Sequence, residues 1–259
     1  DNTFSYICCK PIASITVKDE IITESFPDGK TTTTSIDSTT DVVGIIEAFA
    51  KKFETADNDK KFIQNGLFGY MSYDAVRYFE DIEITKKEGA LEVPDFYYAV
   101  YQNIIAINHF NNEAYIFSHT YKEENNLSEI AQLLTVKSFA EYHFKLEGDQ
   151  QSQMSDEAYI DLVKTCKKHC QRGDVFQIVP SKRFSQNFSG DEFNVYRSLR
   201  SVNPSPYLFF FDYGNFKIFG SSPEAQLIVK EGKAEIHPIA GTFKRTGNDE
   251  KDAALAKKL

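Results

Sequence analysis

Two short turns in the second half of the chain combine small residues with groups that could act on an anionic substrate. Residues 220–224, with the sequence GSSPE, place a carboxyl group after small residues at the end of a predicted strand. Residues 238–242, with the sequence PIAGT, leave a strand through a similar turn. Backbone N–H groups in such turns can bind anions, and a nearby carboxyl group can act as a general acid. Ordinary tight turns share this composition, so from composition alone both interpretations stay open.

Three other segments could carry chemistry. A loop with two prolines, residues 203–207, comes just before an apolar strand. Cys166, His169 and Cys170 place three potential metal ligands within about one helical turn. A structural zinc site needs about four ligands and no partner cluster stands out, so we interpret the cysteines as half-buried thiols. Lys182 and Arg183 form a basic patch that could bind an anion, although a solvated surface is the simpler interpretation.

Charge and composition exclude several classes of protein. The 259 residues include 29 Lys and Arg against 38 Asp and Glu, a net charge of -9, whereas nucleic-acid binders usually carry the opposite balance. No apolar run approaches the roughly 18 residues that span a bilayer. Four cysteines are too few for a disulfide framework in a chain of this length. We expect no nucleic acid, no membrane and a cytoplasmic location.

The first half of the chain is predicted to form mainly hairpins. Asp41 can cap a helix whose apolar residues recur at spacings of three and four. The polar stretch 148–154 is the best candidate for a boundary between regions. The predicted strands are 4–7, 13–17, 20–25, 97–107 and 114–119, and the predicted helices are 42–53, 73–80 and 123–136.

The second half has sharper signals. Ser155 can cap a helix that ends near Arg172, before Gly173, with an apolar stripe of Ile160, Val163, Cys166 and Cys170. Alternation over 175–185 predicts a strand on which Gln177 points away from the phenylalanines. Two hairpins are predicted, 208–213 with 216–219 and 225–230 with 234–237. We expect the last helix, which opens near residue 248, to be cut at Leu259.

Read together, these motifs resemble the large, chorismate-using subunit of anthranilate synthase. The segments that carry the resemblance are 69–77, 173–177, 181–184, 196–200, 203–207, 220–224 and 238–242. The resemblance implies an α+β fold in which two mainly antiparallel sheets pack together with helices outside. It also implies an N-terminal family region over 1–147 and the first part of the chorismate-binding domain over 154–259.

The resemblance implies roles for several residues. Glu224 would protonate the C4 hydroxyl of chorismate as it leaves, while ammonia adds at C2. Ser222, Ala240, Gly241 and Thr242 would hold the substrate. A Mg²⁺ ion, which the family requires, would be held by residues beyond Leu259, so no metal site is expected within the chain. The isolated chain is therefore expected to be inactive.

Two positions separate related activities. Isochorismate and salicylate synthases carry a lysine where this chain has Gln177, and a neutral amide cannot activate water as that base. Aminodeoxychorismate synthase commonly carries a lysine where this chain has Ala240. Both positions favour anthranilate synthase, with Gln177 assigned to the catalytic site. The folate-pathway enzyme remains the nearest alternative.

Feedback inhibition is a second implied property. The candidate residues for binding L-tryptophan are Asn203, Pro204, Ser205, Pro206, Tyr207 and Leu208. The leucine replaces a commoner methionine, and the upstream LLES-type segment is missing. The family also implies a glutamine amidotransferase subunit that supplies ammonia. A non-catalytic piece that binds tryptophan or this partner is the alternative from another class.

Overall fold

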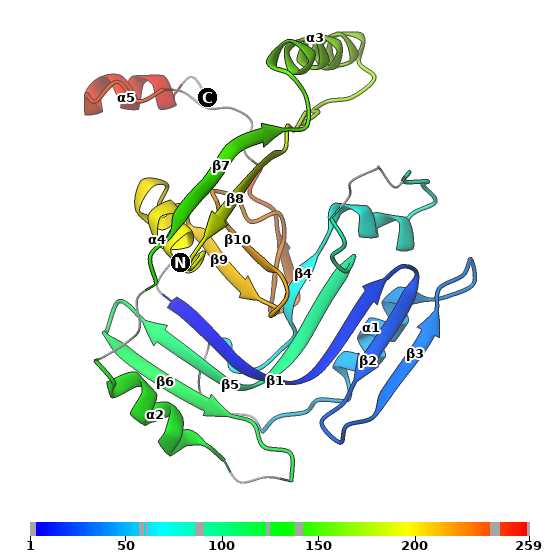
Figure 1. The fold of residues 1–259 in the computed structure, drawn as a ribbon, viewed down its shortest axis with the longest axis vertical. Coiled ribbons are helices and arrows are strands. Elements are labelled where there is room, and N and C mark those ends of the chain that lie inside the picture. Colours follow the sequence, from blue (N-terminus) through cyan, green and yellow to red (C-terminus); the bar gives the residue numbers. More distant parts are fainter. Residues whose placement is uncertain are drawn as a thin grey trace. The chain divides into compact units, whose positions relative to one another are not determined.

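The computed structural model describes residues 4–56, 60, 62–85, 91–122, 125–137, 142–238 and 244–257. The chain, drawn in Figure 1, divides into two compact units. Unit 1 comprises Asp1–Ser138 together with Phe211–Ile218. Unit 2 comprises Phe139–Phe210 and Phe219–Leu259. Each unit therefore consists of two separate stretches of the sequence.

Unit 1 is built on one six-stranded antiparallel sheet. Its order is β3-β2-β1-β5-β4, and β6 pairs with the remaining part of β5. The strands are β1 Phe4–Lys18, β2 Ile21–Ser25, β3 Thr31–Ser35, β4 Phe68–Met71, β5 Phe96–Asn108 and β6 Glu113–Ser118. The prediction of two separate strands, 4–7 and 13–17, was wrong, because both belong to β1. Lys10 has a φ of 60° and the register shifts between Pro11 and Ala13, so a bulge separates the two apolar runs without ending the strand.

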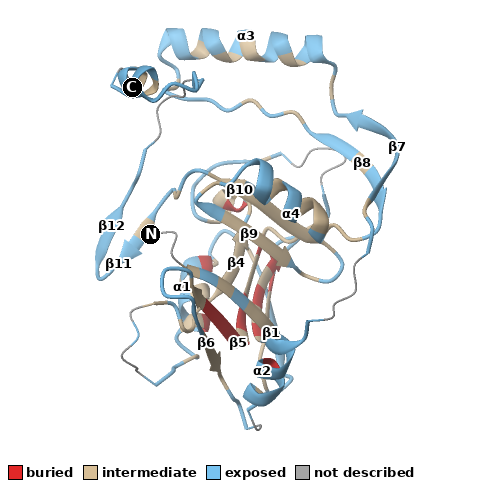
Figure 2. Cartoon of the chain, turned by 90° about the vertical axis from the view of Figure 1, so that its left-hand side faces the viewer, coloured by how far each residue is buried: buried red, intermediate tan, exposed pale blue. Residues whose placement is uncertain are grey.

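The core of unit 1 lies between the sheet and helix α1, Val42–Ala50. Asp41 caps this helix as predicted, because its carboxylate accepts a hydrogen bond from the Gly44 N–H at 2.9 Å. The helix ends three residues before the predicted bound. Phe49 is fully buried and packs with Ile15, Val17 and Phe96 of the sheet. Figure 2 shows the buried residues concentrated in this unit.

Two short helices and a polar network complete unit 1. A 3-10 helix covers Tyr73–Tyr78, and α2 covers Leu127–Thr135. Arg77 forms a 2.7 Å ion pair with Asp95, and the Tyr78 hydroxyl donates to the same carboxylate oxygen at 2.7 Å. Ser72 N–H donates to the Asp95 carbonyl at 2.7 Å. These bonds join the 3-10 helix to the start of β5.

An aromatic cluster explains why residues 211–218 belong to unit 1. The Tyr213 ring lies 4.4 Å from the Tyr97 ring and 5.6 Å from the Tyr70 ring, and Phe216 lies 5.0 Å from Tyr213. The Tyr213 hydroxyl is buried and has no hydrogen-bond partner among the residues that the structure describes, and burial raises the pKa of this tyrosine well above its usual value. The tip of the β9–β10 hairpin thus packs on the sheet of unit 1.

Unit 2 contains short strand pairs and helices. Strands β7 and β8 pair antiparallel, as do β11 and β12, while β9 pairs with β10. The elements are β7 Lys145–Ser152, α3 Asp156–Arg172, β8 Phe184–Ser189, α4 Phe193–Val202, β9 Tyr207–Asp212, β10 Lys217–Ser222, β11 Ile228–Lys230, β12 Lys233–Glu235 and α5 Asp249–Ala256. Both predicted hairpins are confirmed. None of the described residues of unit 2 is fully buried.

Three predictions about this part of the chain need correction. The polar stretch 148–154 is mostly strand β7, which is exposed at every position and so carries no apolar alternation. The stretch 175–183 is irregular, because β7 pairs with β8 only from Phe184 onward. The half-buried stripe of α3 is Tyr159, Val163, Cys166 and His169, so it is shifted from the predicted stripe. The family regions 1–147 and 154–259 stay a prediction.

Candidate functional site

The turn that carries Glu224 follows directly from β10. The Ser222 hydroxyl accepts a hydrogen bond from the Glu224 N–H at 3.3 Å and donates one to the Glu224 carbonyl at 3.1 Å. These two bonds close the turn around Pro223 and leave the Glu224 side chain exposed. The hydroxyl of Ser222, predicted to contact substrate, thus shapes the turn that presents the predicted acid.

The proline loop lies next to this turn. The Ser221 hydroxyl donates a 2.6 Å hydrogen bond to the Asn203 carbonyl, and Asn203 N–H donates to the Leu199 carbonyl at 2.8 Å, at the end of α4. The structure therefore brings together two motifs that are 18 residues apart in the sequence. Of the predicted inhibitor-binding residues, Ser205 and Leu208 are half-buried, and the exposed ones are Asn203, Pro204, Pro206 and Tyr207.

Aromatic packing holds α4 on the β9–β10 pair. Phe210 lies 5.0 Å from Phe193 and 5.6 Å from Phe219 between ring centroids, and Tyr196 lies 5.4 Å from Phe210. Gly220 permits a close approach beside this cluster, because a Cβ atom there would lie 2.7 Å from the Phe209 ring. The helix that precedes the proline loop and the strand that precedes the acid turn are therefore parts of one packed group.

Gln177 lies in the irregular segment after α3 and is exposed. The start of this segment is fixed by Asp174, whose carboxylate bonds the His169 Nδ1 at 2.8 Å and the Arg172 Nε at 3.0 Å. Hydrogen bonds, first from Arg172 and then from His169, hold the pKa of Asp174 below its usual value. Within the described residues, no hydrogen bond joins Gln177 to Glu224, and their joint role in catalysis stays a prediction.

The predicted basic patch is not a simple solvated surface. The Lys182 side chain is only 9% exposed and forms an ion pair with Asp156 in the first turn of α3. Its ammonium group also lies 5.1 Å from the centroid of the Phe184 ring. The hydroxyl of Tyr159 donates to the Pro180 carbonyl at 3.2 Å. These contacts attach the first half of α3 to residues 180–184.

Three of the predicted substrate-binding residues, Ala240, Gly241 and Thr242, lie outside the described residues. His169 bonds Asp174, Cys166 is half-buried and Cys170 is exposed. Among the described residues, no group of three or more His, Cys, Asp or Glu side chains could hold a metal ion. The described helices include none that is both long and apolar enough to cross a membrane.

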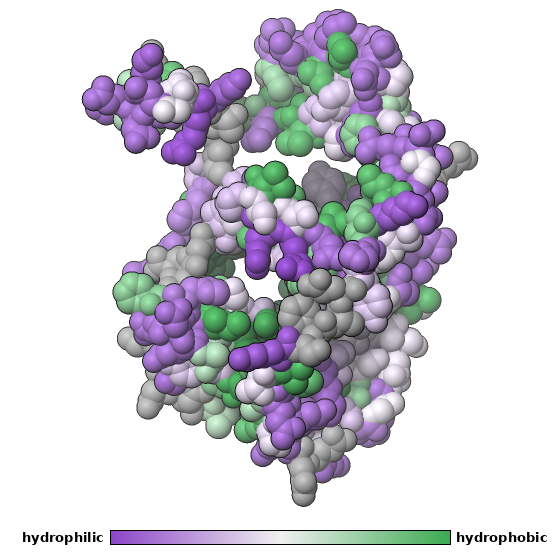
Figure 3. All heavy atoms as spheres, turned by 60° about the vertical axis from the view of Figure 1, so that its left-hand side comes forward, coloured by the Kyte–Doolittle hydropathy of each residue, from purple (hydrophilic) through white to green (hydrophobic). Residues whose placement is uncertain are grey.

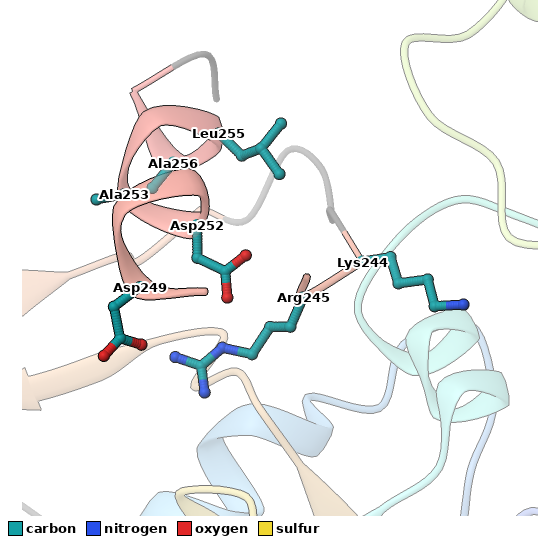
Figure 4. Close-up of a pocket in the computed structure, with 7 residues that line it drawn as sticks. All are labelled: Lys244, Arg245, Asp249, Asp252, Ala253, Leu255 and Ala256. Carbon is teal, nitrogen blue, oxygen red and sulfur yellow. The ribbon is translucent and has the colours of Figure 1, made fainter. Parts of the chain in front are cut away.

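A cavity of about 390 Å³ lies beside α5 and is drawn in Figure 4. Asp252 accepts hydrogen bonds from the N–H and hydroxyl groups of Thr246 at 2.8 and 2.7 Å, which lower the pKa of its carboxyl group. The Lys244 side chain points away from the helix in Figure 4. The lining residues are Lys244, Arg245, Asp249, Asp252, Ala253, Leu255 and Ala256.

Comparison with known proteins identifies the family. The family model described as chorismate binding enzyme matches residues 11–259. Anthranilate synthase component 1 of Saccharomyces cerevisiae is 36% identical over 240 residues, which cover 85% of this chain and 47% of the yeast protein. Aminodeoxychorismate synthase component 1 of Bacillus subtilis is 32% identical over 260 residues, which cover 96% of this chain and 54% of that protein. The chain thus spans about half the length of these relatives.

A solved structure supports the fold. The crystal structure of anthranilate synthase component I from Streptococcus pneumoniae TIGR4 matches with a TM-score of 0.74 and 24% identity, over 99% of this chain and 56% of that one. The predicted α+β class with mainly antiparallel sheets is confirmed by this match and by the strand pairing described above. With a family match over nearly its whole length, the chain belongs to the family of chorismate binding enzymes.

Proposed function

We propose that the protein acts as component I of an anthranilate synthase, which converts chorismate and ammonia to anthranilate and pyruvate. The observation that carries this proposal is the lack of lysine at both positions where related enzymes use one, which are Gln177 and Ala240 here. Neither a neutral amide nor a methyl group can activate water or attack the ring covalently. Ammonia is then the nucleophile.

The proposed reaction assigns one proton transfer to this chain. Ammonia adds at C2 of chorismate, and the C4 hydroxyl departs as water after Glu224 gives it a proton. Elimination of pyruvate then gives the aromatic amine. The Ser222–Glu224 bonds support this role, because they hold the backbone of the turn that carries the carboxyl group. Gly241 and Thr242 would hold a substrate carboxylate, and Ala240 would leave room for the ring.

The cofactor and partners are parts of the same proposal. Mg²⁺ would serve the whole protein, but the described residues offer no cluster of ligands that fits it, so no step is assigned to the metal. A glutamine amidotransferase subunit would supply ammonia. L-Tryptophan would inhibit by binding at residues 203–208. The location would be cytoplasmic.

The test measures product formation by the full-length protein. Chorismate, Mg²⁺ and ammonium at mildly alkaline pH should yield anthranilate fluorescence. Glu224→Gln should lower kcat by about 10²- to 10⁴-fold, the usual contribution of a positioned acid. Glu235→Gln, at an exposed strand position, is the matched control. Near-normal turnover by Glu224→Gln would refute the assignment of the acid.

A second candidate function is supported by the Bacillus subtilis relative, which covers 96% of this chain. An aminodeoxychorismate synthase would consume chorismate without anthranilate fluorescence. Its product would give 4-aminobenzoate after a lyase is added. A protein that only binds would leave chorismate unchanged and still titrate with L-tryptophan or with the amidotransferase subunit.

A further inference from the structure

The hydroxyl of Ser221 connects the end of β10 to the start of the proline loop. It donates a 2.6 Å hydrogen bond to the backbone carbonyl of Asn203, which lies where α4 ends and the proline loop begins. Ser221 itself is half-buried in β10, one residue before the turn that carries Glu224. A backbone carbonyl is a fixed acceptor, so the bond constrains the position of β10 rather than that of a mobile side chain.

The Asn203 end of this bond is well held. Its N–H caps α4 through Leu199, and Pro204 and Pro206 restrict the backbone that follows. Helix α4 is in turn packed on β9 and β10 through the rings of Phe193 and Phe210. The carbonyl that accepts from Ser221 is therefore a rigid reference point within unit 2.

The Glu224 end is held less firmly. Ser222 closes the turn locally, but Pro223 and Glu224 are exposed. Packing therefore contributes little to the position of the acid. Within the described residues, the hydrogen bond from Ser221 ties the last residues of β10 to the proline loop.

We propose that Ser221 is a positioning residue, whose hydroxyl ties the end of β10 to the Asn203 carbonyl and so places the carboxyl group of Glu224 against the departing C4 hydroxyl. This inference rests on the proposed function of Glu224. A misplacement of about 1 Å in a reacting group can cost about 100-fold in rate. Loss of the tie should therefore lower kcat more than it weakens substrate binding.

The first experiment compares kcat and KM in the full-length protein. Ser221→Ala should lower kcat about 10- to 100-fold, with the KM for chorismate within about 2-fold of wild type. Ser221→Thr, which retains the hydroxyl, should restore most of kcat. Ser201→Ala is the matched control, because the Ser201 hydroxyl also donates to a backbone carbonyl, that of Arg197 at 3.1 Å, but within α4. An unchanged kcat in Ser221→Ala would overturn the inference.

A double-mutant cycle separates positioning from general support of the fold. If Ser221 acts only through the acid, Ser221→Ala should cause no further loss in the Glu224→Gln background. The same fold-loss in both backgrounds would overturn the inference. If the Ser221→Ala variant unfolds, Ser221→Cys takes its place, because a thiol is of similar size to the hydroxyl but is a weaker hydrogen-bond donor. A wild-type kcat in Ser221→Cys would also refute the role of Ser221.

The two proposals fail in different ways. If the wild-type protein forms no anthranilate, the proposed function fails before Ser221 is tested. If the wild type is active and Glu224→Gln is inactive while Ser221→Ala equals wild type, only the role of Ser221 fails.

Discussion

Units 1 and 2 differ in how they hold their elements in place. In unit 1, α1 and the six-stranded sheet enclose fully buried side chains such as Phe49 and Ile15. The described part of unit 2 has no fully buried residue, and its segments are joined by half-buried aromatic contacts, ion pairs and single hydrogen bonds. Both units also carry apolar side chains among hydrophilic ones at the surface (Figure 3). The turn predicted to carry the acid thus lies in a unit whose described part has no fully buried core, where hydrogen bonds and half-buried aromatic contacts hold its neighbours.

The largest effect on stability should come from removing a buried side chain from the core of unit 1. Phe49→Ala removes a fully buried ring and should lower the free energy of unfolding by about 3–5 kcal/mol. Denaturant unfolding measures the change in the free energy of unfolding. Amide hydrogen exchange should show reduced protection in β1 and β5. Val43→Ala, on the same helix and 56% exposed, is the control and should change little. An equal loss in both variants would contradict the proposed core.

Alkaline pH should also affect unit 1 first. Burial raises the pKa of Tyr70 and of Tyr101 to about 12. An unfolded chain releases these protons near pH 10, so the unfolded state is increasingly favoured as the pH rises from about 10 to 12. The protection factors for hydrogen exchange in β4 and β5, which are corrected for base-catalysed intrinsic exchange, should therefore fall over this range.

Phenylalanine substitutions test this pH dependence. Tyr70→Phe and Tyr101→Phe should each move the onset of this fall in protection to higher pH. Tyr73→Phe, at a position that is 84% exposed, is the control and should leave it in place. The same onset in all three variants would show that burial of these tyrosines does not cause the loss of stability.

A smaller effect is expected from a helix cap in unit 2. The Ser155 hydroxyl accepts from the Ala158 N–H at 3.2 Å, so Ser155→Ala should destabilise α3 by about 1 kcal/mol. Exchange should accelerate in α3, while unit 1 stays as in wild type. Ser152→Ala, whose hydroxyl donates to the Met154 carbonyl before the helix, is the matched control. Acceleration in unit 1 would show that the two units are not independent.

The smallest expected change is an increase in the stability of unit 1. The Tyr213 hydroxyl is buried and finds no hydrogen-bond partner in the described part of the chain, which costs free energy that a phenylalanine would not cost. Tyr213→Phe should raise the stability of unit 1 by up to about 1 kcal/mol in denaturant unfolding. Tyr115→Phe is the comparison, because it removes a hydroxyl that donates to Glu113 at 2.7 Å. A marked loss of stability in Tyr213→Phe would indicate that this hydroxyl has a hydrogen-bond partner.

Local signals explain what the sequence could predict. Helix α3 was placed to within a residue, because Ser155 and Gly173 mark its ends directly. The β9–β10 hairpin was predicted from Gly214-Asn215 between two aromatic runs. The strand predicted over 175–185 failed for a non-local reason, because alternation does not supply a partner strand. The polar strand β7 gave no apolar pattern from which it could be predicted.

In the candidate site, too, local features were predictable and contacts between distant residues were not. The sequence singled out Glu224, Ser222 and the proline loop as unusual, and the small residues around them made turns predictable. It gave no reason to join Ser221 to Asn203, because that bond depends on how α4 and β10 pack. The burial of Lys182 was missed for the same reason, since its partner Asp156 is distant in the sequence.

The aromatic cluster around Tyr213 has a practical consequence for dissecting the protein. Expression of residues 4–138 alone would omit Tyr213, whose ring packs on Tyr70 and Tyr97, and Phe216, whose ring packs on Tyr70. Such a truncated domain would present a bare patch of tyrosine rings to water and would tend to self-associate. A soluble version of unit 1 needs the hairpin tip grafted back through a linker, or polar replacements at Tyr70 and Tyr97.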